Sequence, residues 1–267
     1  MKTSKIILPV ALAAACAMSS CDDVFEPAAE NLKVVDAMLA DAGYAQGILG
    51  NAYILLPYSN SPQTDYATDD AVCNDLTNSY LQMATGSWTS QTDPTSQWQN
   101  RLNAVQYINL MTANARQVHW SEDADLQELF SDLFEGDAYG MRAVQYFYLL
   151  RAHAGIAANG EMLGVPIITE YQDKDANFNL PRNSFKDCIA FILSDIERAL
   201  SLLPYEYDDI TDENLVPAKY KNRPNPITAA KYSRAFGTHQ KGKINGMILK
   251  ALRAQVALFA ASPAYAQ

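Results

Sequence analysis

The sequence lacks the short motifs that mark common catalytic sites. It has no G-x-S-x-G nucleophile motif, and its three histidines, His119, His153 and His239, are far apart and form no H-E-x-x-H pair. The segment GTHQKGKI has the glycine spacing of a phosphate-binding loop, but Ile244 occupies the position that must supply a hydroxyl group to Mg²⁺. We therefore expect a protein that is not an enzyme.

Metal and glycosidase patterns are also incomplete. The segment DKDANFN begins like a calcium-binding loop, but Phe178 replaces the required glycine and Ser184 replaces the bidentate glutamate. A solvated loop is favoured there, and an opportunistic Ca²⁺ site stays open. Glycosidic hydrolysis needs two carboxylates on rigid elements. The available acids occupy a polar stretch where carboxylates usually cap helices or form turns, and they are Asp69, Asp70, Asp75 and Asp93. Catalysis is therefore the weaker hypothesis, and we expect no cofactor.

Positive charge is scarce. The chain has 20 Lys and Arg against 30 Asp and Glu, a formal net charge of -10. Removal of Lys2 and Lys5 with an N-terminal export signal would leave 18 against 30, or -12. This balance disfavours nucleic acid or an anionic membrane surface as a partner, and it suits neutral ligands.

Cysteine is rare, and one of the four is placed distinctively. Residues 1–20 have a basic start and a short apolar run, as in an export signal, and small residues precede Cys21. We interpret Cys21 as the lipid attachment site of a mature lipoprotein that begins with a tether over residues 21–31. The alternative is a soluble secreted protein with an incidental cysteine. Cys73 and Cys188 could pair or remain free thiols.

The chain has no sustained period-2 alternation, so a sheet is not expected. Helical periodicity predicts an all-α protein, with helical hairpins of tetratricopeptide type despite the lack of a strict 34-residue repeat. Ser184 and Asp187 have capping-box spacing, and Pro204 ends that helix. Gly136 and Gly140 predict a weakened long helix or a helix pair. The expected helices span residues 32–56, 97–118, 121–157, 184–203 and 243–259.

Two long polar stretches, residues 57–96 and 204–242, separate these helices and should be functional loops. The first mixes aromatic rings with amides and carboxylates, which suits sugar rings with apolar faces and hydroxyl edges. Trp98, in helical register with Leu102 and Val105, is interpreted as core packing. Trp88 could be a ligand platform or a loop anchor. The candidate ligand-binding residues are Tyr66, Asp70, Asn74, Asn78, Tyr80 and Trp88.

Several stretches, in order, resemble the SusD/RagB family of Bacteroidetes surface lipoproteins. The similar stretches are CDDVFEP, TDDAV, WQNRLNAVQYINLMTANA, MRAVQYFYLLRAHAG with GVPII, RNSFKDCIAFILSDIERALSLLP and KGKINGMILKALRAQVALFAASPAY. The connection between residues 156 and 163 is longer than the family pattern. Family members are about twice as long, so residues 32–267 resemble a SusD-like helical domain cut short on its C-terminal side.

The resemblance implies capture of oligosaccharides and their delivery to a SusC-like TonB-dependent transporter. It places the protein at the outer membrane, lipid-anchored and exposed at the cell surface. Two alternatives stay open: a RagB-like lipoprotein that captures peptides, and a structural lid of the transporter with no ligand of its own.

Overall fold

The computed structural model describes residues 30–57, 62–89, 91–221, 223 and 225–265. The expected export signal, Cys21 and most of the tether lie outside these residues. The chain divides into two compact units, residues 1–37 and 38–267. The first contributes only the start of helix α3 (Glu30–Ala40) to the description, so the fold below is that of the second unit.

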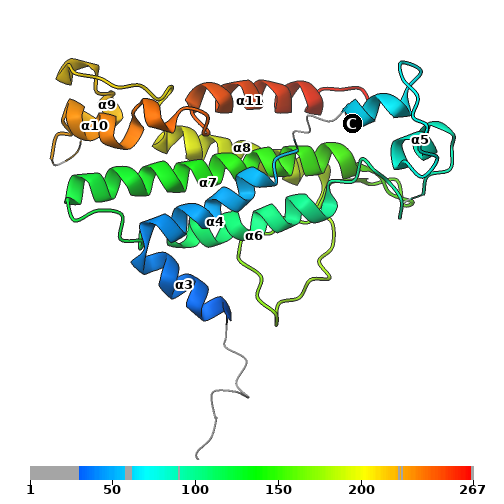
Figure 1. Cartoon of the computed structure of the whole chain (residues 1–267), viewed down its shortest axis with the longest axis horizontal. Coiled ribbons are helices and arrows are strands. Elements are labelled where there is room, and N and C mark those ends of the chain that lie inside the picture. Colours follow the sequence, from blue (N-terminus) through cyan, green and yellow to red (C-terminus); the bar gives the residue numbers. More distant parts are fainter. Residues whose placement is uncertain (1–29, 58–61, 90, 222, 224, 266–267) are drawn as a thin grey trace, which may run out of the picture. The chain divides into compact units, whose positions relative to one another are not determined.

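The described chain is mostly helical, as expected for an all-α protein (Figure 1). Besides α3, its longer helices are α4 (Ala42–Ile54), α6 (Trp98–Asn114), α7 (Ala124–His153), α8 (Phe185–Leu202), α10 (Ala229–Phe236) and α11 (Gly246–Ala260). Strands β1 (Gly155–Ile156) and β2 (Met162–Leu163) pair antiparallel, Gly155 opposite Leu163. No described helix combines the length and apolarity needed to cross a membrane.

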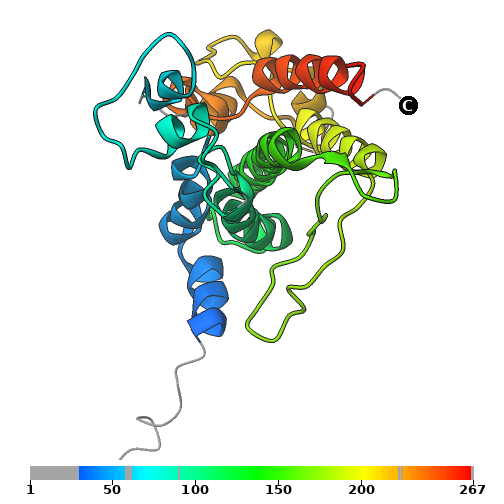
Figure 2. The same ribbon diagram turned by 90° about the vertical axis from the view of Figure 1, so that its right-hand side faces the viewer.

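Helix α7 is the centre of the fold, with α4 and α6 on one side and α8 and α11 on the other (Figures 1 and 2). The side chain of Asp123 caps its start by accepting from the backbone N–H groups of Asp125 and Leu126. The helix then runs unbroken for 30 residues, so the expected weakening near Gly136 does not occur.

The two glycines of α7 instead allow close packing. A Cβ on Gly136 would lie 2.7 Å from Leu203 Cγ, and one on Gly140 would lie 2.4 Å from Ile244 Cγ2. Neighbouring side chains thus occupy the space that a larger residue would need. Tertiary packing offsets the low helix propensity of glycine, about 1 kcal/mol per residue.

Helix α8 follows the sequence expectation closely. Ser184 Oγ accepts from the Asp187 backbone N–H at 3.0 Å and donates to Asp187 Oδ2 at 2.7 Å. The helix buries Ile192 and Ile196 against α7 and ends at Leu202, before Pro204. Capping and periodicity therefore identified this element with its boundaries.

The two polar stretches are more structured than expected. The first contains the 3₁₀ helix η1 (Pro62–Ala67) and helix α5 (Ser79–Ala84). The second contains η2 (Glu213–Leu215), α9 (Ala218–Lys221), α10 and η3 (Thr238–Gln240). Tyr207, Tyr220 and Phe236 from the second stretch are fully buried. Residues 204–242 thus contribute buried aromatic side chains to the core, although most positions of this stretch are exposed.

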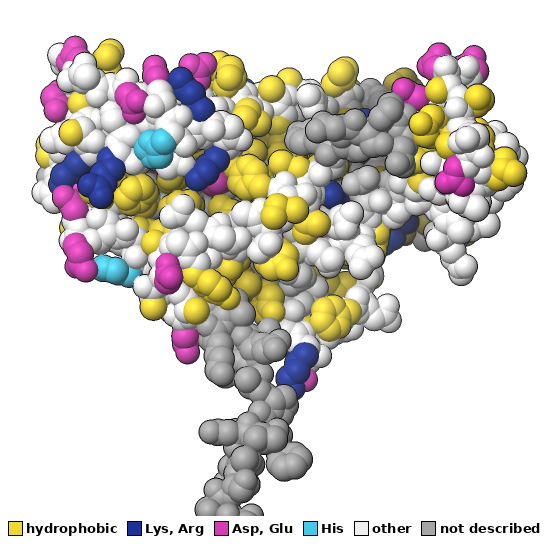
Figure 3. Space-filling view, in the orientation of Figure 1, with side chains coloured by type: hydrophobic (Ala, Val, Ile, Leu, Met, Phe, Trp, Pro, Cys, Tyr) yellow, Lys and Arg dark blue, Asp and Glu magenta, His cyan; other side chains and the backbone are white. Residues whose placement is uncertain are grey.

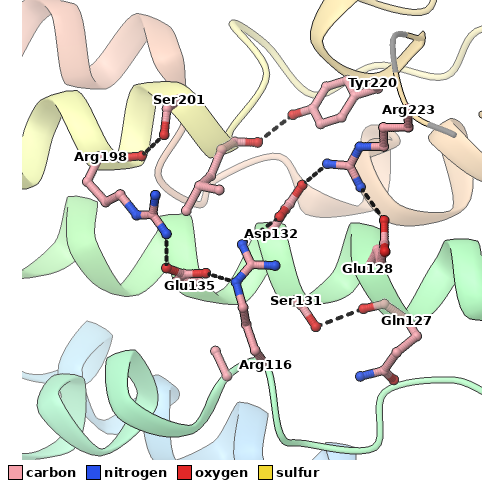
Figure 4. A network of polar contacts seen from close by, with 12 residues as sticks. Arg116, Gln127, Glu128, Ser131, Asp132, Glu135, Arg198, Ser201, Tyr220 and Arg223 are labelled. Carbon is pink, nitrogen blue, oxygen red and sulfur yellow. Dashed lines mark hydrogen bonds and ion pairs between the residues drawn. The ribbon is translucent and has the colours of Figure 1, made fainter.

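An ion-pair network joins three segments to the first half of α7 (Figure 4). Glu135 receives Arg116 at 2.6 Å and Arg198 of α8 at 2.7 Å. Arg223 reaches Glu128 at 3.2 Å and also pairs with Asp132. Because Asp132 and Glu135 are nearly buried, these contacts are less screened than ordinary surface pairs. The network holds the segment after α6, α8 and the segment after α9 on α7.

Candidate functional site

The second unit carries an exposed lobe of residues 62–97, formed by η1, α5 and turns; we call it the aromatic lobe. Hydrophobic side chains lie on its surface, at the right of Figure 3. Val72 is 86% exposed, Leu76 81% and Trp88 48%. None of residues 64–89 and 91–97 is fully buried, so within this range the lobe has no core of its own.

Short-range polar contacts shape the lobe. Asp75 Oδ1 accepts from the backbone N–H and the hydroxyl of Thr77, and Asp93 Oδ1 accepts likewise from Thr95. The hydrogen bonds from Thr77 lower the pKa of Asp75. These carboxylates therefore form turns, as the sequence analysis favoured over a catalytic pair.

The lobe uses two candidate ligand residues in its own structure. Asn78 caps α5, its Oδ1 accepting from the backbone N–H groups of Tyr80 and Leu81. The Tyr80 hydroxyl donates to the carbonyl oxygen of Pro94 at 3.2 Å. Their sugar-binding role stays a prediction. Because the Asn78 oxygen and the Tyr80 hydroxyl are already hydrogen-bonded, a sugar would contact the Asn78 amide N–H groups and the Tyr80 ring.

The other four candidates lie along the lobe without converging on one described pocket. Tyr66 is half-buried in η1, whereas Asp70 and Asn74 are exposed. Trp88 follows α5 and is about half exposed, as a platform for a ring would have to be. Their role as ligand contacts stays a prediction.

The interpretation of Trp98 as core packing is wrong. Along the face of α6 that Trp98 shares with Leu102 and Val105, Val105 is buried, Leu102 is half-buried and Trp98 is 38% exposed. Helical spacing identified the face, but the core ends before the first turn of the helix. Trp98 instead lines a cleft.

His153, at the end of α7, holds the start of α6. Its ring meets the Trp98 ring edge to face, with centroids 5.4 Å apart and planes at 87°. His153 Nε2 accepts from the Gln97 backbone N–H at 3.0 Å, which requires an unprotonated Nε2. Burial lowers the pKa of His153, in agreement with a neutral ring.

The cleft beside Trp98 lies between α6 and the segment after β2 and measures about 300 Å³. Figure 2 shows this segment looping out beside α6. The lining residues are Trp98, Leu102, Asn103, Gln106, Pro166, Ile168, Gln172, Phe178 and Leu180. The sequence analysis assigned none of them to a ligand site, because it interpreted Trp98 as core packing. Phe178 is 65% exposed, and an aromatic residue within the polar segment DKDANFN was the one sequence feature that could have indicated this cleft.

The far wall of the cleft is anchored to the core. Asn109 Nδ2 donates to the carbonyl oxygens of Ile168, at 3.1 Å, and Glu170, at 2.9 Å. The Tyr146 hydroxyl accepts from the Ile168 backbone N–H at 2.7 Å. Because Asn109 and Tyr146 are both fully buried, this wall is positioned by rigid helices and not by the loop alone.

Within the described residues, no three His, Cys, Asp or Glu side chains gather as a metal site would require. Of the two alternatives for Cys73 and Cys188, a disulfide or free thiols, the structure shows free thiols. Cys188 is buried and its thiol contacts the Val165 backbone.

A family model covers most of the chain. Residues 33–220 match a SusD-like family described as starch-binding and associating with the outer membrane. The chain belongs to this SusD-like family. The family is one of binding proteins and not of enzymes, and its description associates it with the outer membrane. No curated protein matches the sequence.

Solved structures share the SusD-like fold. A SusD-like protein from Bacteroides fragilis superposes with a TM-score of 0.60 at 17% identity, over 84% of this chain and 36% of the other. A putative sugar binding protein from Bacteroides vulgatus gives 0.55 at 20% identity, over 83% and 43%. A laminarin binding SusD-like protein gives 0.55 at 18%, over 81% and 40%. This chain thus spans about two fifths of each structure's length.

Proposed function

We propose that this protein captures neutral oligosaccharides at the cell surface and delivers them to a SusC-like TonB-dependent transporter. The observation that carries the proposal is the aromatic lobe, which presents the half-exposed Trp88 in a member of a starch-binding family. An exposed indole is a suitable platform for the apolar face of a sugar ring. The net charge of -10 favours neutral over anionic glycans.

Cys21 is the proposed anchor. It follows an apolar export-type segment, and acylation there would hold the chain on the outer membrane, since each buried CH₂ contributes about 0.8 kcal/mol. The acidic residues after it, Asp22 and Asp23, resemble the sorting signal for the outer leaflet. Surface exposure and the transporter partner are parts of the same proposal.

Calorimetric titration of the full chain, in a detergent without a sugar head group, tests the proposal. The panel contains plant, host and microbial oligosaccharides and mixed peptides. Heat from one glycan class alone is the expected result. Heat from peptides alone would establish the RagB-like alternative. If no member of the panel gives heat of binding although the protein has native helicity, glycan capture is contradicted and a ligand-free lid is favoured.

A further inference from the structure

We propose that the cleft between α6 and residues 166–180 binds a single neutral pyranose ring, as a subsite distinct from Trp88 on the aromatic lobe. The inference rests on the proposed function, because it takes the ligand to be a glycan. It adds the place and the chemistry by which one ring of that glycan is recognised.

The size of the cleft suits one ring. Its volume of about 300 Å³ is at the lower end of the range for small-molecule sites, roughly 300–1,000 Å³. A site of this size holds one sugar residue with its substituents and not a length of chain. The rest of an oligosaccharide would extend from the mouth of the cleft into solvent.

The lining has the composition that a sugar requires. None of its nine residues carries a charge. Trp98 and Phe178 offer aromatic rings from opposite walls, and the apolar C–H face of a pyranose packs on such rings. Three carboxamides, from Asn103, Gln106 and Gln172, supply donors and acceptors for hydroxyl groups. A phosphate or carboxylate would find no cationic side chain in this lining.

Two of the three carboxamides, Gln106 and Gln172, hydrogen-bond to each other's residue, and the third, Asn103, is available to a ligand. Gln106 Nε2 donates to Gln172 Oε1 at 3.1 Å, and Gln106 Oε1 accepts from the Gln172 backbone N–H at 2.8 Å. These contacts tie α6 to the opposite wall and fix both side chains. Asn103, one turn earlier, makes no hydrogen bond to any residue the structure describes, so its carboxamide can serve a ligand in full.

The Ile168 and Trp98 sides of the cleft are formed before any ligand arrives. Asn109 and Tyr146 fix the backbone at Ile168, and His153 fixes Trp98 from behind. A site held by buried polar contacts loses little conformational entropy on binding. The affinity for a ring should therefore depend on the contacts of Asn103 and Phe178 and not on ordering of the backbone at Ile168.

The test compares single variants of the full chain by calorimetry, with the best oligosaccharide of the panel as the probe. Asn103→Ala and Phe178→Ala are each expected to weaken binding about tenfold, the effect of losing one good contact of roughly 1.4 kcal/mol. Asn100→Ala is the matched control, because Asn100 is an exposed asparagine of the same helix outside the cleft. Both cleft residues are partly or fully solvent-facing, so circular dichroism should be unchanged.

The outcomes separate this inference from the proposed function. Weakening by both cleft variants with an unchanged Asn100→Ala supports the subsite. Unchanged affinity in both, together with a loss in Trp88→Ala, would overturn the subsite while glycan capture stands. If the wild-type chain binds no glycan, both proposals fail, whereas displacement of the glycan from the cleft by peptides would overturn the pyranose subsite alone. A fluorescence response to methyl hexosides that survives in Trp88→Phe and disappears in Trp98→Phe is the expected second signal.

Discussion

Arg142 of α7 and Asp195 of α8 form a bidentate ion pair in the protein interior. Arg142 Nε lies 2.7 Å from Asp195 Oδ2, and Nη2 lies 2.8 Å from Oδ1. Both side chains are about 5% exposed, and burial raises the pKa of Asp195 even with the guanidinium beside it. Arg142 Nη1 also donates to Asn109 Oδ1 at 3.0 Å, which connects the pair to the residue that anchors the cleft.

Asp195→Ala should destabilise the fold by about 3–5 kcal/mol, because it leaves a buried guanidinium without its counter-charge. The double variant Arg142→Met with Asp195→Leu should cost less than Asp195→Ala alone, since it removes both charges. Urea unfolding measures each change. Glu197→Ala is the control: its pair with Arg253, at 2.6 Å, is solvent-exposed and should be worth about 0–1 kcal/mol. Equal losses in Asp195→Ala and the control would contradict this account.

Gly140→Ala should destabilise by roughly 1–3 kcal/mol through overpacking, since its Cβ would meet Ile244 at 2.4 Å. Gly50→Ala in α4 should have the opposite sign. No atom lies within 4 Å of its added Cβ, so the higher helix propensity of alanine should raise stability by about 0.5–1 kcal/mol. Thermal unfolding of the two variants gives the comparison. A stabilised Gly140→Ala would show that the contact with Ile244 relaxes easily.

Stability should fall as pH rises from about 4 to about 7 through the contribution of Asp137. Burial raises the pKa of Asp137 to about 7, and its carboxylate accepts from the Tyr53 hydroxyl, with Lys243 nearby. The ordinary value in an unfolded chain is about 4. Between these values the folded state binds the additional proton, so raising the pH favours unfolding.

Asp137→Asn should remove that slope, and the difference between the two curves should reach at most about 4 kcal/mol above pH 7, the equivalent of about three pKa units. His153 acts in the opposite direction, because its pKa is lowered by burial. It is common to both proteins, so the difference curve isolates Asp137. Parallel curves for the variant and the wild type would contradict the raised pKa.

Trp88→Ala should weaken glycan binding while the helical circular dichroism signal stays unchanged, because Trp88 lies outside the core. Stacking of a ring on an aromatic side chain is worth about 0.5–1.5 kcal/mol beyond area burial, so a several-fold loss is expected. Titration of the same oligosaccharide into both proteins measures it. Unchanged affinity would assign Trp88 to the lobe's own structure.

Cys21→Ala should release the protein from the membrane fraction and from the cell surface. The physical reason is the loss of the acyl chains, whose partition into the bilayer supplies the attachment. Fractionation of cells followed by protease accessibility of the intact surface gives the readout. A variant that stayed membrane-bound and surface-exposed would show that Cys21 is not the anchor.

Local signals allowed part of the fold to be predicted. Ser184, Asp187 and Pro204 delimit α8 through short-range chemistry, and the prediction of its extent is confirmed. The continuity of α7 was not predictable, because Leu203 and Ile244 fill the space beside its glycines from distant segments. Helix α10 was missed although its buried residues Ala229, Tyr232 and Phe236 have helical spacing, because the proline-rich stretch around it was interpreted as a loop.

The cleft could not be predicted from the sequence either, because contacts between distant segments form it. Gln106 and Gln172 are 66 residues apart, and no local pattern indicates that they meet. Periodicity placed Trp98 on the correct face of α6 but carried no information on where the core ends. The composition of residues 57–96 indicated a surface with aromatic rings, and of the rings described there Trp88 is about half exposed whereas Tyr66 and Tyr80 are half-buried.

The lobe without a core has an evolutionary consequence. Substitutions at positions such as Val72, Leu76 or Trp88 remove little buried area, so they should cost little folding free energy. Mutations can therefore accumulate there and alter which molecule is recognised while the helices beneath stay intact. One scaffold can in this way acquire a different surface while its fold is kept.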